Sequence, residues 1–70
     1  MRLRLGNPEL VPELRRHFER AGFVTNRLNA ETIEAWRPGA PRAEQERREI
    51  DDHLAVWHLM HASDRVELVD

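Results

Sequence analysis

The chain has 70 residues, a net charge of −2 and no cysteine. This length allows one small domain, residues 1–70. The lack of cysteine excludes disulfide bonds, thiolate metal sites and thiol catalysis, and the weakly acidic charge argues against a general binder of nucleic acid or anionic membranes.

The first segment of the chain has the pattern of a strand. Arginine and leucine alternate over residues 2–5, which is the period of a half-buried strand. Leu3 and Leu5 would then face the core, and Arg2 and Arg4 would face away from it.

A helix is predicted to follow this strand. Asn7 can cap its N-terminus through its side-chain oxygen. Pro12 falls inside the pattern, where a proline removes a backbone hydrogen bond, so we expect either a kink or a short turn over residues 8–11 before the regular helix. The helix should end near Ala21, because Gly22 suits the left-handed conformation that closes many helices.

Residues 23–28 and 32–36 form a predicted β-hairpin. The second strand alternates regularly and directs Trp36 outward. The first strand alternates poorly, since Val24 and Leu28 can both point inward only if the intervening asparagine does so as well. A bulge or an edge position in the sheet would relieve this conflict.

The stretch over residues 41–62 predicts the longest helix. Pro41 suits its first turn, where a missing N–H removes no intrahelical hydrogen bond. Ile50, Leu54 and Trp57 recur at helical spacing, which indicates that one face of this helix packs on the core.

The last alternating segment, residues 65–69, completes the order β-α-β-β-α-β. Helices that connect strands of one sheet through right-handed crossovers lie on the same face of that sheet. We therefore predict an α+β fold, the ferredoxin-like βαββαβ sandwich. Two helices would cover one face of a four-stranded antiparallel sheet with strand order 4-1-3-2, and the other face would stay open.

The order of elements and three short segments resemble a group of small, uncharacterised proteins from high-GC actinobacteria. The three segments are Gly6-Asn7-Pro8, Arg48-Glu49-Ile50 and Leu54-Ala55-Val56-Trp57. The resemblance covers nearly the whole chain and implies a fold, but it carries over no functional residue. At the level of the fold the chain is also similar to acylphosphatases, RNA-recognition motifs, metal-chaperone domains and ACT-type regulatory domains, and the fold alone does not choose among them.

No constellation in the sequence predicts catalysis, a metal or a cofactor. His58 and His61 are three residues apart on the long helix and could share a metal ion, but a zinc site needs at least a third protein ligand. We expect His17 and His58 to be solvated, and His53 and His61 to be partly covered. The only serine, Ser63, lies in a predicted turn, so we expect no enzyme.

The open face of the predicted sheet is the most informative surface. Trp36 is its anchor, with Arg4 and Arg27 as the main contact residues and Arg2 and Arg65 around them, because Trp and Arg are enriched at the centres of protein interfaces. The residues expected on this face are Arg2, Arg4, Thr25, Arg27, Glu34, Trp36, Arg65 and Glu67. An alternative is that these side chains only form cross-strand pairs in solvent.

The sequence thus favours a small non-catalytic protein-interaction or regulatory module. Its partner would be another protein or a second copy, which would make a homodimer through the open face or an edge strand. One alternative is a module that binds single-stranded RNA or DNA on the same face, although one tryptophan is fewer than the two or three aromatic residues that such sheets use. A second alternative is an ACT-like domain that senses a small ligand. No apolar run approaches ~18 residues, so we expect a cytoplasmic protein without a membrane span.

Overall fold

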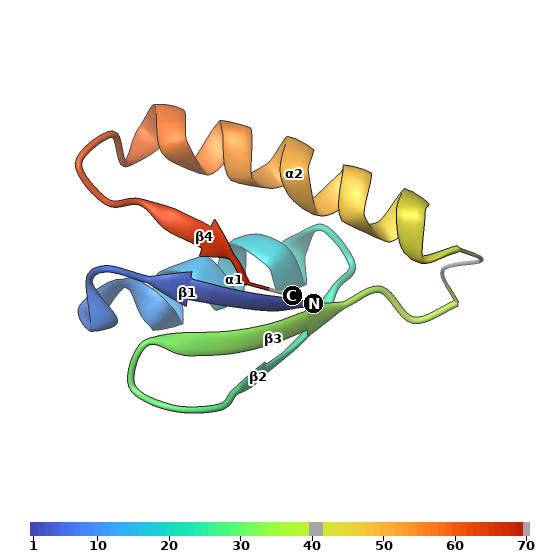
Figure 1. The fold of residues 1–70 in the computed structure, drawn as a ribbon, viewed down its shortest axis with the longest axis horizontal. Helices are drawn as coiled ribbons and strands as arrows, with labels where there is room; N and C mark the ends of the chain where they lie inside the picture. Colours follow the sequence, from blue (N-terminus) through green and yellow to red (C-terminus); the bar gives the residue numbers. More distant parts are fainter. Residues whose placement is uncertain (40–41, 70) are drawn as a thin grey trace.

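In the described part of the chain, four strands and two α-helices follow one another in the predicted order (Figure 1). The computed structural model describes residues 1–39 and 42–69. The elements are β1 (Arg2–Leu5), the 3-10 helix η1 (Pro8–Leu10), α1 (Val11–Arg20), β2 (Val24–Arg27), β3 (Thr32–Trp36), α2 (Ala43–Met60) and β4 (Val66–Leu68).

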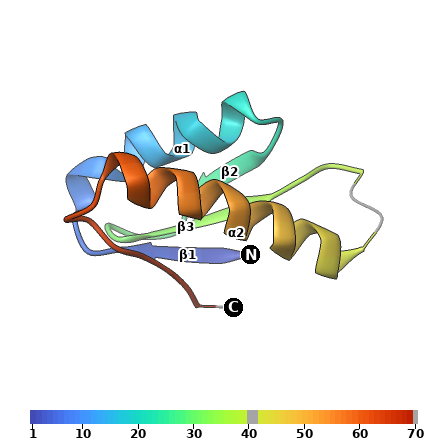
Figure 2. The ribbon, with the colours of Figure 1, turned by 90° about the horizontal axis from the view of Figure 1, so that it is seen from above.

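The four strands form one antiparallel sheet in the order β2-β3-β1-β4. Read from the opposite edge, this is the order 4-1-3-2 that the sequence predicts. Both helices lie on the same side of the sheet (Figure 2), and their buried residues share one core with the strands. The predicted α+β architecture, two helices with a four-stranded antiparallel sheet, is confirmed in the described residues.

The core lies between the helices and the sheet. Trp57 is only 1% exposed and is the largest side chain in the core, which confirms its predicted place. The alternation in β1 is also confirmed, because both of its leucines are buried and both of its arginines are exposed. The buried apolar residues are Leu3, Leu5, Val11, Leu14, Phe18, Phe23, Ile33, Ala35, Ile50, Leu54, Trp57 and Val66.

The first helical segment divides at the position that the sequence indicates. Asn7 Oδ1 accepts a hydrogen bond from the Glu9 N–H at 3.1 Å, and η1 forms the short turn ahead of α1. Pro12 falls in the first turn of α1, where its missing N–H removes no intrahelical bond. Beyond α1, Gly22 has a φ of +93° and the Phe23 N–H donates to the Phe18 carbonyl at 3.0 Å, which closes the helix as predicted.

Helix α2 is shorter than the predicted range 41–62, because it begins at Ala43 and ends at Met60. The His61 N–H still donates to the Trp57 carbonyl at 2.8 Å and closes the last turn. The prediction for Pro41 lies outside the described residues.

The predicted orientation of β2 is wrong. Thr25 was expected on the open face, yet it is 8% exposed and lies opposite the buried Ala35. Arg27 was expected beside it on the open face, and it lies opposite the buried Ile33, on the side of the sheet that carries the helices. Since side chains alternate along a strand, Val24 and Asn26 point toward the open face instead.

The reason lies in the turn that follows α1. Gly22 closes the helix, and Phe23 then packs edge-on against Phe18 with ring centroids 5.3 Å apart. With Phe23 inward, the next inward position belongs to Thr25, whose hydroxyl bonds to side chains of α1. The contact that orients β2 is therefore made outside the strand.

Candidate functional site

The open face is the side of the sheet that neither helix covers. Its charged and apolar side chains come from all four strands and from two residues just beyond strand ends, Leu28 after β2 and Val69 after β4. The outward-facing residues are Arg2, Arg4, Val24, Asn26, Leu28, Thr32, Glu34, Trp36, Glu67 and Val69.

One end of the open face is apolar. Trp36 ends β3 and is 36% exposed, which confirms its predicted outward orientation. Val24 lies directly opposite it on β2 and is also exposed. Val69 adds a further exposed apolar side chain to this face, and Leu28 adds one at the opposite end, beside Thr32. The prediction omitted Val24, Leu28 and Val69 because it directed Thr25 and Arg27 outward and assigned only charged residues of the last strand to this face.

The charges on the open face are balanced across strands. The Arg4 guanidinium (Nη2) donates to Glu67 Oε2 at 3.0 Å, and the register places these two residues opposite each other. Arg2 lies opposite Glu34 in the pairing of β1 with β3. Both side chains of the Arg4–Glu67 pair are more than half exposed, so that pair contributes at most about 1 kcal/mol.

Two of the five predicted contact residues lie elsewhere. The Arg27 guanidinium donates to the carbonyls of Asn29 and Ala30, both at 3.1 Å, and so holds the turn between β2 and β3. Arg65 precedes β4 and lines two hollows, one with His58 and Ala62 and one with Arg4 and Glu67. The structure therefore brings Trp36, Arg2 and Arg4 onto one face, places Arg27 at the β2–β3 turn, and leaves Arg65 at the hollow that Arg4 also borders.

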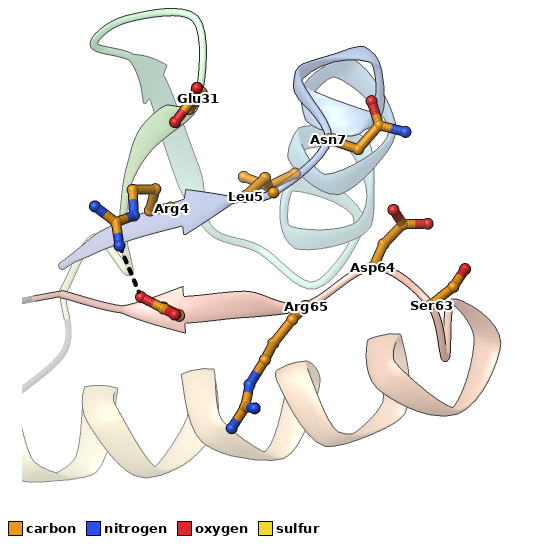
Figure 3. Close-up of a pocket in the computed structure, with 9 residues that line it drawn as sticks. Arg4, Leu5, Asn7, Glu31, Ser63, Asp64 and Arg65 are labelled. Carbon is orange, nitrogen blue, oxygen red and sulfur yellow. Dashed lines mark hydrogen bonds and ion pairs between the residues drawn. The ribbon is translucent and has the colours of Figure 1, made fainter.

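A polar hollow of about 500 Å³ lies at the end of the sheet where three connections meet (Figure 3). Asn7 follows β1, Glu31 belongs to the β2–β3 turn, and Asp64 lies between α2 and β4. The Arg4–Glu67 pair borders the hollow on the strands.

This hollow offers little catalytic chemistry. Its described lining includes the hydroxyl of Ser63 but no imidazole that could act as its base. The side-chain oxygen of Asn7 already caps η1. Among residues 1–39 and 42–69, no three metal-ligating side chains come close enough to hold an ion.

The histidines differ from two of the predictions. His58 was expected to be solvated, but its Nε2 accepts the Val66 N–H at 3.1 Å and ties α2 to β4. His17 was also expected to be solvated, but it lies half-buried between the helices, 5.4 Å from His53 and 6.0 Å from Trp57 between ring centroids. Both residues belong to contacts between elements, which helical spacing alone does not reveal.

The position of His17 affects its proton equilibrium. Burial lowers the pKa of His17 below its ordinary value of 6.5, and the neighbouring charges of His53, Arg20 and His61 act in the same direction. A backbone hydrogen bond at His53 opposes this shift. The folded chain therefore disfavours the protonated imidazole.

The domain is expected to lose stability in mild acid because of His17. The unfolded chain binds more protons than the folded chain below the ordinary histidine pKa, so the free energy of unfolding should fall between about pH 7.5 and about pH 5.5. Urea unfolding at these two pH values measures the fall, and His17→Gln should reduce it. An equal fall in the variant and in the unaltered chain would show that His17 is not its source.

Comparison with family models, curated proteins and solved structures finds no match for this chain. No helix among the described residues is both long and apolar enough to cross a membrane.

Proposed function

We propose that this chain is a small non-catalytic interaction module with the ferredoxin-like arrangement, and that it forms a homodimer through its open face. The observation that carries the proposal is the exposed apolar end of that face, where Trp36 and Val24 lie opposite each other on neighbouring strands. A large aromatic side chain among smaller apolar neighbours is the usual composition of an interface centre.

The charges of the open face suit contact with a second copy. A two-fold interface brings the same patch of both subunits together, so a patch that carries both signs of charge can be complementary to itself. Arg2 and Arg4 on β1 lie between Glu34 on β3 and Glu67 on β4. A nucleic-acid partner is less well supported, because Arg27 is bound to the carbonyls of the β2–β3 turn and Arg4 is paired with a glutamate.

The size of the domain favours self-association as well. A standard interface buries about 800 Å² on each partner, which is about one sixth of the 4674 Å² that this chain exposes. Small domains without disulfides or metals commonly gain apolar burial by pairing.

Trp36→Ala is expected to weaken the dimer at least ~10-fold, because interface tryptophans often contribute 2 kcal/mol or more to association. Sedimentation equilibrium of the unaltered chain and the variant measures the change in dissociation constant. Far-UV circular dichroism should show that the variant stays folded, since Trp36 lies outside the core.

Leu59→Ala is the matched control for this experiment. Leu59 is 85% exposed on α2, on the helical side of the molecule, so its loss should leave the dimer unchanged. A monomeric unaltered chain at ~100 μM, where weak interfaces of this kind still associate, would contradict the proposal. So would a dimer that Leu59→Ala dissociates and Trp36→Ala does not, because the interface would then lie on α2.

A further inference from the structure

The two helices border a groove on the side of the molecule away from the open face. The groove has a volume of about 270 Å³. Glu13, Arg16, His17 and Arg20 of α1 form one wall, and Met60 of α2 lies on the other. Ligand pockets usually start at about 300 Å³, so the groove suits only a small molecule.

The groove is basic although the chain as a whole is acidic. Arg16 and Arg20 are four residues apart on α1, which places both side chains on one side of the helix. Among the described residues, neither guanidinium has an ion-pair partner. The one carboxylate among the described lining residues, Glu13, already contacts Nε2 of His61 at 3.2 Å. Two guanidiniums are thus available to an anion.

The base of the groove is aromatic. The ring of His61 stacks on Trp57 with centroids 3.9 Å apart, and the ring of His17 meets the same indole edge-on. His17 Nε2, Trp57 Nε1 and His61 Nδ1 are buried without a hydrogen-bond partner among the described residues. Such groups are rare in folded proteins and call for a structural or functional explanation.

We propose that this groove binds a small organic carboxylate. The guanidiniums of Arg16 and Arg20 hold the carboxylate, because the planar donor fork of arginine matches its two oxygens. The apolar part of the ligand lies against Met60 and the ring of His61, which covers Trp57, and this contact distinguishes an organic acid from an inorganic anion. The proposal is independent of the homodimer, since the groove lies on the opposite side of the sheet from the open face.

Benzoate is a suitable probe, since it joins a carboxylate to a flat apolar ring. Titrating it into the ¹⁵N-labelled chain should give saturable shifts at the amides of residues 16–20 and at the Trp57 indole, with a dissociation constant of about 1–10 mM. Acetate, which lacks the apolar part, and inorganic phosphate should each bind at least ~5-fold more weakly.

The double variant Arg16→Gln/Arg20→Gln should weaken benzoate binding at least ~10-fold, since it removes both charged donors to the carboxylate. Arg47→Gln/Arg48→Gln removes the same charge from exposed positions on α2 and should leave binding unchanged. The proposal is overturned if benzoate gives no saturable shift, if both double variants lose binding equally, or if phosphate binds as tightly as benzoate.

Discussion

Replacing Trp57 by alanine is expected to remove a large part of the stability of the domain. Trp57 is 1% exposed, packs in the same core as Ile50 and Leu54, and contacts the rings of His17 and His61. Truncating a buried tryptophan to alanine typically costs about 3–5 kcal/mol. A domain of this length has a total free energy of unfolding of about 4–10 kcal/mol. The variant should therefore lose about a third or more of the free energy of unfolding and unfold at a clearly lower urea concentration.

Urea unfolding followed by far-UV circular dichroism measures this loss. Leu59→Ala is again the matched control, because Leu59 lies two residues further along the same helix and is 85% exposed. Its free energy of unfolding should change by less than about 0.5 kcal/mol. If the two variants unfolded at the same urea concentration, Trp57 would not be the anchor of the core.

Trp57 could be placed from the sequence because its environment is set by its own helix. Ile50, Leu54 and Trp57 recur at the helical period, so any packing of α2 on the sheet buries all three together. The same holds for β1, where a strict alternation allows only one buried face. Strong local patterns of this kind also led to the correct strand order, because each helix must connect strands of one sheet.

The candidate site was predicted less well because its members depend on contacts between elements. Arg65 lies just before β4, and it lines two hollows whose other walls come from different parts of the chain, which the pattern of the strand does not reveal. His17 is half-buried only because α2 packs against its side of α1. Trp36 and Arg4 were placed correctly, since both belong to strands with regular alternation.

The orientation of β2 is the clearest case in which local pattern fails. The strand reads Val-Thr-Asn-Arg. Val24 and Asn26 share one face and Thr25 and Arg27 the other, so neither face is apolar and the pattern does not say which one is buried. Thr25 faces inward because its hydroxyl is satisfied by α1: it donates to Glu19 Oε2 at 2.7 Å and accepts from Arg15 Nε at 3.0 Å. A buried hydroxyl without such partners would disfavour this orientation. The exposure of Val24 on the open face therefore depends on two side chains from another element.

Thr25→Val should accordingly destabilise the domain by about 1–3 kcal/mol, although valine has nearly the same shape and a higher strand propensity. The substitution removes both hydrogen bonds and leaves a carboxylate and a guanidinium facing an apolar group. The same substitution at Thr32, which faces outward on β3, should change the free energy of unfolding by less than about 0.5 kcal/mol.

A double-mutant cycle with Glu19→Gln isolates the contact between β2 and α1. If the hydroxyl–carboxylate bond orients β2, Thr25→Val and Glu19→Gln should be non-additive by at least ~0.5 kcal/mol in urea unfolding. Additive effects, or a Thr25→Val variant as stable as Thr32→Val, would mean that the burial of Phe23 alone fixes the strand. In that case the apolar end of the open face would owe its exposure to the turn at Gly22 rather than to the bond between Thr25 and α1.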